Sequence, residues 1–143
     1  SENYAISTNG DALGGVMYND VNGVFTAGKA REQHFGNYAS TVNGDAKGGA
    51  IYNAGSINQI FTQDSNWYDS AYENYVESTN GTAMGGFIYN EGTIGNVIMG
   101  IARDNYAKGN KAYGGFLYNT GDITIRTSII IINFFNDRIN TIR

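Results

Sequence analysis

Cysteine and proline are both absent from the 143-residue chain, and histidine occurs once. Without cysteine the protein can form neither disulfides nor thiolate metal sites. Charge is also scarce, because charged residues make up 15% of the chain against the ~25% usual for soluble domains. The formal net charge of −4 offers no basic surface to nucleic acid or anionic membranes. We therefore expect no cofactor, no metal and no nucleic-acid partner.

Long hydrophobic runs are missing as well. The longest, Ile129 to Ile132 followed by Phe134 and Phe135, is far shorter than the ~18 residues of a membrane-spanning helix. We therefore expect no membrane insertion of this segment. A hydrophobic content of 41% argues against disorder, and 143 residues suit one domain.

Glycine, by contrast, is abundant, with 20 residues, and it marks an internal repeat. The motif Gly-Gly-x-aliphatic-Tyr-Asn occupies residues 14–19, 48–53, 85–90 and 114–119, at spacings of 34, 37 and 29 residues. An Asn-Tyr pair precedes each copy, and a Gly-x-Ile element follows the last three. Because Asn3-Tyr4 already belongs to the first copy and no methionine precedes it, we expect a processed or excised part of a longer protein.

The repeat predicts strands rather than helices. Glycine and asparagine disfavour helix interiors, and the apolar residues come in short β-branched and aromatic runs between Gly/Asn turns. Variable spacing fits a solenoid whose loops bulge outward while its strands keep their register. We predict an all-β parallel β-helix with about two coils per 29–37-residue repeat over residues 1–125, and a C-terminal strand or cap of the same domain over 126–143.

Alternation along a strand then assigns side chains to two faces. One position is always aliphatic, so we expect these residues to point inward: Met17, Ile51, Ile88 and Leu117. The positions on either side should point outward: Val16, Ala50, Phe87 and Phe116, together with Tyr18, Tyr52, Tyr89 and Tyr118.

The motifs resemble the repeats of autotransporter (type V secreted) passenger domains, which carry tandem Gly-Gly-Ala-Ile-Tyr-Asn-x-Gly-Thr-Ile units. The closest stretch is Gly85 to Ala107, and Gly48 to Ile57 matches nearly as well. The polymorphic outer-membrane proteins carry related repeats. The resemblance covers about residues 1–125 and implies a right-handed parallel β-helix on a bacterial surface or secreted from it, often as an adhesin. It implies no catalytic residues.

Aromatic side chains are the candidate binding residues. An outward row of Tyr52, Tyr89 and Tyr118 would supply contact area for a protein or a sugar, or would form a structural stack. Trp67 and Tyr68 lie in the longest insertion, residues 62–73, and insertions on one side of a solenoid often carry binding.

The C-terminal segment departs from the repeat, because no glycine follows Gly121. The last coil of a solenoid exposes unpaired backbone, so the end needs a cover. We expect Ile129, Ile131 and Phe134 to belong to a final strand or cap, or to an edge that pairs with another chain.

Catalytic chemistry has little support in the sequence. Asp11 and Asp45 are repeat equivalents, and two coils apart they would lie ~10 Å from each other, near the separation in inverting glycosidases. Both follow Asn-Gly turns, however, and His34 lies in a variable stretch that suggests a loop. We therefore predict a non-enzymatic surface or secreted repeat protein that acts in adhesion or self-association. Its partner would be a protein or glycan of a host or neighbouring cell, or itself. The alternatives are an end-to-end filament subunit, a carbohydrate-active β-helix enzyme and an ice-binding solenoid.

Overall fold

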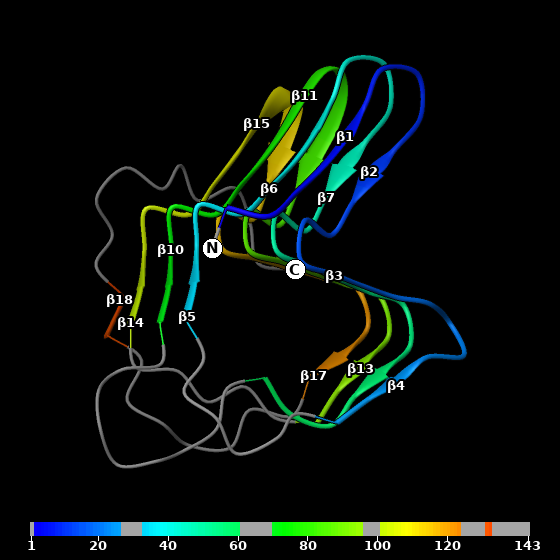
Figure 1. The fold of residues 1–143 in the computed structure, drawn as a ribbon, viewed down its shortest axis with the longest axis vertical. Helices are drawn as coiled ribbons and strands as arrows, with labels where there is room; N and C mark the ends of the chain where they lie inside the picture. Colours follow the sequence, from blue (N-terminus) through cyan, green and yellow to red (C-terminus); the bar gives the residue numbers. More distant parts are fainter. Residues whose placement is uncertain (1, 27–32, 61–69, 96–100, 124–130, 133–143) are drawn as a thin grey trace.

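A computed structural model of the chain describes residues 2–26, 33–60, 70–95, 101–123 and 131–132. Within these ranges the regular structure consists of strands, without helices, and every strand pairing is parallel. The strands form four sheets that run side by side through a stack of similar turns (Figure 1).

Each sheet collects equivalent strands from successive repeats. The first sheet contains β1 (Tyr4–Ser7), β6 (Tyr38–Thr41), β11 (Tyr75–Met84) and β15 (Tyr106–Tyr113), joined by β2 (Ala12–Leu13) and β7 (Ala46–Lys47). The second contains β3 (Met17–Asn19), β8 (Ile51–Asn53), β12 (Ile88–Asn90) and β16 (Leu117–Asn119). The third contains β4 (Val24–Phe25), β9 (Ser56–Ile57), β13 (Thr93–Ile94) and β17 (Asp122–Ile123). The fourth contains β5 (Gln33–Phe35), β10 (Ser70–Tyr72), β14 (Ile101–Arg103) and β18 (Ile131–Ile132).

The register shows that each repeat makes one turn of the stack. Ile88 pairs with Ile51 on one side and with Leu117 on the other, so equivalent residues of consecutive repeats are direct neighbours. The prediction of two coils per repeat is therefore wrong. The extra length of each repeat goes into an arm (Figure 1). On the outgoing limb β1 pairs with β6, and β6 pairs with the first half of β11. On the returning limb β2 pairs with β7, and β7 pairs with the second half of β11.

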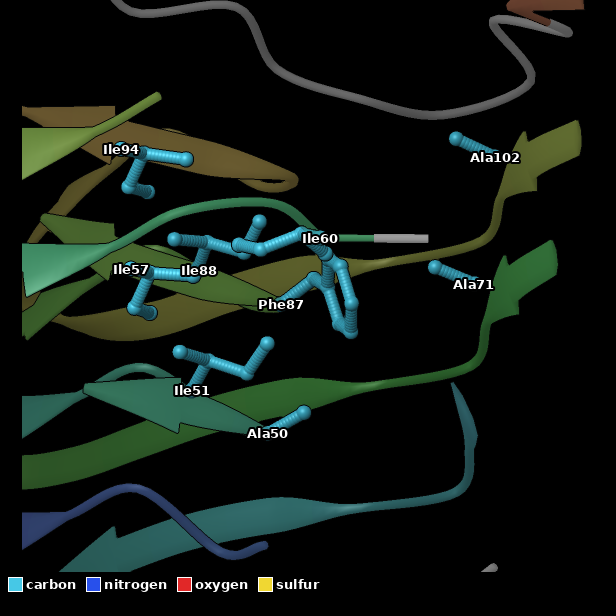
Figure 2. Close-up of a cluster of buried hydrophobic side chains, with 9 residues drawn as sticks. All are labelled: Ala50, Ile51, Ile57, Ile60, Ala71, Phe87, Ile88, Ile94 and Ala102. Atoms are coloured by element: carbon cyan, nitrogen blue, oxygen red, sulfur yellow. The ribbon is translucent and has the colours of Figure 1, made fainter. Parts of the chain in front are cut away.

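Three apolar clusters among the described residues hold the turns together; one of them, around Tyr52 and Tyr89, is described with the candidate site. The main core lies between the second, third and fourth sheets and includes Ile51, Ile57, Ile88 and Ile94 (Figure 2). The arm has its own core of small residues, in which Ala39 and Val76 of the outgoing strands pack against the returning limb: Ala12, Ala46 and Ala83. Alanine at these positions lets the two limbs of the arm approach closely.

The aliphatic positions point inward as predicted. The outward prediction for the preceding position is wrong at three of its four residues, because Ala50 and Phe87 are buried in the same core and Phe116 packs against it. The backbone explains the error. The N–H groups of Phe87 and Ile88 both donate to the carbonyl of Phe116, at 3.0 and 2.9 Å, so the chain bends there and strand alternation begins only afterwards. Gly85, with φ of +69°, permits this bend.

Buried asparagines form ladders that cross all the turns. Nδ2 of Asn19 donates to Oδ1 of Asn53 at 2.7 Å, Asn53 donates to Asn90 at 2.7 Å, and Asn90 donates to Asn119 at 2.6 Å. A second ladder, buried except at Asn3, joins the asparagines of the Asn-Tyr pairs: Asn3, Asn37, Asn74 and Asn105. In the described residues no buried side-chain nitrogen or oxygen lacks a partner. The asparagines therefore satisfy the backbone at the corners between sheets.

Candidate functional site

The repeated aromatic feature that solvent reaches in every described turn is a row of four tyrosines on the outer face of the arm, which we call the arm ladder: Tyr4, Tyr38, Tyr75 and Tyr106. Successive ring centroids lie 5.3, 4.8 and 4.9 Å apart, and the rings are nearly parallel. Strand alternation creates the row, because Ala5, Ala39, Val76 and Ala107 take the inner positions of the same strands.

Stacking determines what the arm ladder can contact. Each inner ring is covered by a ring on either side, so a ligand meets ring edges and hydroxyls. Only the end residues Tyr4 and Tyr106, 62% and 40% exposed, keep one ring face uncovered within the described residues. Burial raises the pKa of Tyr75 and of Tyr106, so these hydroxyls remain neutral donors at neutral pH. The next outward positions along the strands carry Ile6, Ser40, Glu77 and Lys108.

A second tyrosine row, the inner ladder, contains the predicted site residues Tyr52, Tyr89 and Tyr118, with Tyr18 at its first-turn end. It faces away from the main core, as predicted, but it is not an open surface. Tyr52 and Tyr89 are each only 7% exposed. They pack with Met84 of the returning arm limb, and Leu13 and Tyr113 of the same limb lie against this cluster.

The inner ladder also has a polar anchor. The hydroxyls of Tyr52 and Tyr89 both donate to the carboxylate of Glu91, and the amine of Lys47 lies 5.7 Å from the centroid of the Tyr89 ring. Burial and the neighbouring Glu91 raise the pKa of both tyrosines. These contacts tie adjacent turns together, and they favour the structural reading of this row over the binding reading.

The two repeat-equivalent aspartates act within the turn at the tip of the arm. Oδ1 of Asp11 accepts the backbone N–H of Asp45 at 2.8 Å, and Oδ1 of Asp45 accepts that of Thr82 at 2.9 Å. Lys47 Nζ lies 3.6 Å from Asp11 and 4.0 Å from Asp45. The predicted ~10 Å separation is wrong, because these residues belong to adjacent turns. Their carboxylates cap backbone groups, which favours the turn reading over an acid–base pair.

The remaining sequence candidates fall elsewhere. His34 belongs to β5 and not to a loop, and its ring centroid lies 5.4 Å from that of Phe87. Trp67, Tyr68, Ile129 and Phe134 lie outside the described residues. Ile131 lies in β18, which pairs with β14 as the last strand of the fourth sheet.

Sequence reasoning did not select the arm ladder, although its signal was present. The Asn-Tyr pair recurs in all four repeats, and a residue that recurs in register necessarily forms a row. Among the residues that the structure describes, no cluster of three or more His, Cys, Asp or Glu side chains could hold a metal ion. In the same residues, no helix is long and apolar enough to span a membrane.

No family model, curated protein or solved structure matches this chain.

Proposed function

We propose that the protein is a non-enzymatic surface or secreted repeat protein, a right-handed parallel β-helix that acts in adhesion or self-association. The handedness rests on the resemblance to autotransporter passenger repeats and on the right-handed preference of parallel crossovers. The same resemblance supports an extracellular or bacterial outer-surface location. The one-turn repeat supports the scaffold part of the proposal, because it repeats the same side chains at regular intervals along the stack.

The arm ladder is the observation that supports a role in binding a partner. Stacked tyrosines supply contact area and hydroxyl groups at a low cost in conformational entropy, which is why aromatic residues are enriched at binding surfaces. The arm ladder lies on the outer face of the arm, away from the main core, and its members are exposed or half-buried. The inner ladder lacks this accessibility, so we assign the contact surface to the arm.

The row suits a partner that is itself repetitive and weakly charged. Its donors and acceptors are spaced ~5 Å apart, the separation of neighbouring parallel strands. A glycan chain or an extended protein segment on a host or neighbouring cell presents hydroxyls or amides that such a row can bind. Charge has a small role, since the one ion pair described on this surface, Lys108 with Glu77, is solvent-exposed.

Attachment of beads to cells tests the proposal. Beads coated with the full chain are incubated with cultured cells, and the attached beads are counted. Tyr38→Thr and Tyr75→Thr shorten the row while threonine keeps a strand-forming residue in place. Tyr113→Thr, also half-buried but off the row, is the matched control. Circular dichroism establishes that each variant is folded.

We expect the unsubstituted chain and the Tyr113→Thr variant to attach equally and both arm-ladder variants to attach several-fold less. Equal attachment by the unsubstituted chain and all three variants would show that the arm ladder does not take part in attachment. If the chain cleaves a polysaccharide and the Asp45→Asn variant does not, the protein is an enzyme and the non-enzymatic proposal is wrong.

A further inference from the structure

The arm ladder brings phenol rings of neighbouring turns into direct contact. Tyr38 and Tyr75 lie in the second and third turns, and each has a described turn on either side. Their ring centroids lie 4.8 Å apart, and the ring planes differ by 5°. The ring of Tyr106 lies 4.9 Å beyond that of Tyr75, at 4°. The strand register fixes these neighbours, because the three tyrosines are direct partners in the first sheet.

Phenol rings are also the most abundant side chains that this protein offers to an oxidant. The chain has 11 tyrosines, one tryptophan and three methionines, and without cysteine no thiol competes for the oxidant. A phenol that gives up one electron and its hydroxyl proton becomes a neutral tyrosyl radical. Two such radicals couple through the ring carbons next to the hydroxyl-bearing carbons, and the hydrogens on the coupled carbons then move to the oxygens. The product, dityrosine, contains one new carbon–carbon bond.

The position of the arm ladder permits both steps of this reaction. Tyr38 and Tyr75 are half-buried on the outer face of the arm, so an oxidant can reach their ring edges and water can accept their protons. Coupling requires two facing carbons to move from stacking distance to a bond of ~1.5 Å, so the rings must slide and tilt. Rings with solvent on their outer side can make this movement.

The inner ladder has the same stacking without this freedom. The ring centroids of Tyr52 and Tyr89 lie 5.3 Å apart and the planes differ by 2°, but each residue is only 7% exposed. Both pack with Met84 of the returning limb, and both hydroxyls donate to the carboxylate of Glu91. These contacts shield the rings and hold them parallel. The two ladders therefore differ in access and in freedom to tilt, but not in spacing.

We propose that neighbouring tyrosines of the arm ladder are a site of oxidative cross-linking, where a one-electron oxidant of the haem peroxidase class, with hydrogen peroxide, joins Tyr75 to Tyr38 or to Tyr106 as dityrosine. The two phenols lose two electrons and two protons, and one hydrogen peroxide takes these up to become two waters. The cross-link joins consecutive turns covalently, as a disulfide would in a chain that contained cysteine. This modification goes beyond the proposed binding role of the same row and does not depend on it.

The stacked arrangement favours coupling within one chain. Radicals on Tyr38 and Tyr75 are already in contact, whereas radicals on two different chains must first meet by diffusion. Such proximity raises the effective concentration of one reactant around the other by many orders of magnitude. The proposal therefore predicts cross-linked monomers in dilute solution, and not covalent oligomers.

Treatment of the full chain with a haem peroxidase and limiting hydrogen peroxide tests the proposal. Dityrosine is followed by its fluorescence, and mass spectrometry gives the mass of each product. Tyr75→Phe and Tyr89→Phe form a matched pair, because each removes only a hydroxyl from a third-turn ring that has a stacked neighbour on either side. Circular dichroism establishes that both variants are folded.

Tryptic fragments identify the residues that are joined. Trypsin cuts after lysine and arginine, so it releases Tyr38 on fragment 32–47 and Tyr106 on fragment 104–108, each without another tyrosine. Tyr75 lies on fragment 48–103, and fragmentation of the joined peptides in the mass spectrometer locates the bond within it.

We expect the unsubstituted chain to become fluorescent, to remain a 15.5 kDa monomer and to lose the mass of two hydrogen atoms for each cross-link. Fragment 48–103 should be joined through Tyr75 to fragment 32–47 in some molecules and to fragment 104–108 in others. Tyr75→Phe should lower the fluorescence several-fold, whereas Tyr89→Phe should leave it unchanged.

Any of four results would overturn the proposal. The folded chain forms no dityrosine under conditions that dimerise free tyrosine; Tyr75→Phe becomes as fluorescent as the unsubstituted chain; Tyr89→Phe loses as much fluorescence as Tyr75→Phe; or the cross-links join different chains only. None of these results concerns attachment to cells, so the bead assay and the peroxidase assay can fail independently of each other.

Discussion

Replacement of one buried asparagine in the ladder that contains Asn19 and Asn53 should destabilise the protein far more than replacement of an exposed asparagine that also bridges neighbouring turns. Asn53 is fully buried in the second turn, where it accepts an amide from Asn19 and donates to Asn90. Asn43, in the same turn, makes the same two kinds of contact, with Asn9 at 3.1 Å and Asn80 at 2.8 Å, but it lies on the surface. Both residues therefore link three consecutive turns through their side chains, and Asn53→Ala and Asn43→Ala form a pair that compares a buried with an exposed link. Asn53 Nδ2 also lies 3.3 Å from the carbonyl oxygens of Gly55 and Thr93.

The magnitude follows from the groups that each substitution leaves behind. Asn53→Ala removes the donor to Asn90 Oδ1, and Asn90 is also fully buried, so a buried acceptor loses its partner at a cost of ~1–3 kcal/mol. The lost bond from Asn19 adds about 1 kcal/mol. We therefore expect a loss of ~2–4 kcal/mol for Asn53→Ala. Water replaces the partners of Asn43, so Asn43→Ala should cost no more than ~0.5 kcal/mol.

Urea unfolding followed by circular dichroism measures both variants. Asn53→Asp separates hydrogen bonding from packing, because aspartate has nearly the shape of asparagine but its carboxylate cannot donate. It should destabilise at least as much as Asn53→Ala at neutral pH. Equal losses for Asn53→Ala and Asn43→Ala, or a harmless Asn53→Asp, would refute the reasoning that buried amide donation holds the turns together.

Three further predictions concern packing, ionisation and backbone geometry. Phe87→Ala should lower the free energy of unfolding by ~3–5 kcal/mol in the same urea assay, because the ring is fully buried in the main core. Burial and Glu91 raise the pKa of Tyr89 above its ordinary value of 10.0, so the folded state stays protonated where the unfolded state ionises. The contribution of Tyr89 to stability should therefore be fully present below about pH 10 and be lost as the pH rises above it, and Tyr89→Phe should flatten that fall in urea midpoints measured across this range. Gly85→Ala should cost ~2 kcal/mol or more in thermal melts, because φ is +69° and an added Cβ would lie 2.0 Å from the carbonyl oxygen of Ile88. Gly10→Ala, where the nearest atom is 3.5 Å away, should cost under ~1 kcal/mol.

The sequence was sufficient to predict strands, parallel stacking and the inward aliphatic row, because each depends on residue types that recur in register. It was not sufficient to predict the number of coils. A repeat of 34 residues at ~3.3 Å per residue measures roughly 110 Å, long enough either for two small coils or for one turn with an arm. Small residues such as Ala39 and Ala46 favour the arm, since they let its two limbs pack closely. From composition alone, however, the same alanines indicate only weak strand formation, so they do not predict the arm.

Equivalence in a repeat predicts which residues stand in a row but not which of them a partner can reach. Tyr18 and Tyr52 occupy the same motif position, yet they are 53% and 7% exposed, because Tyr52 has a turn on either side and lies under the returning limb of the arm. Accessibility therefore depends on the turn number and on the covering limb, and neither can be read from the motif. We therefore place the proposed contact surface on the outer face of the arm, where every described turn presents an exposed or half-buried tyrosine.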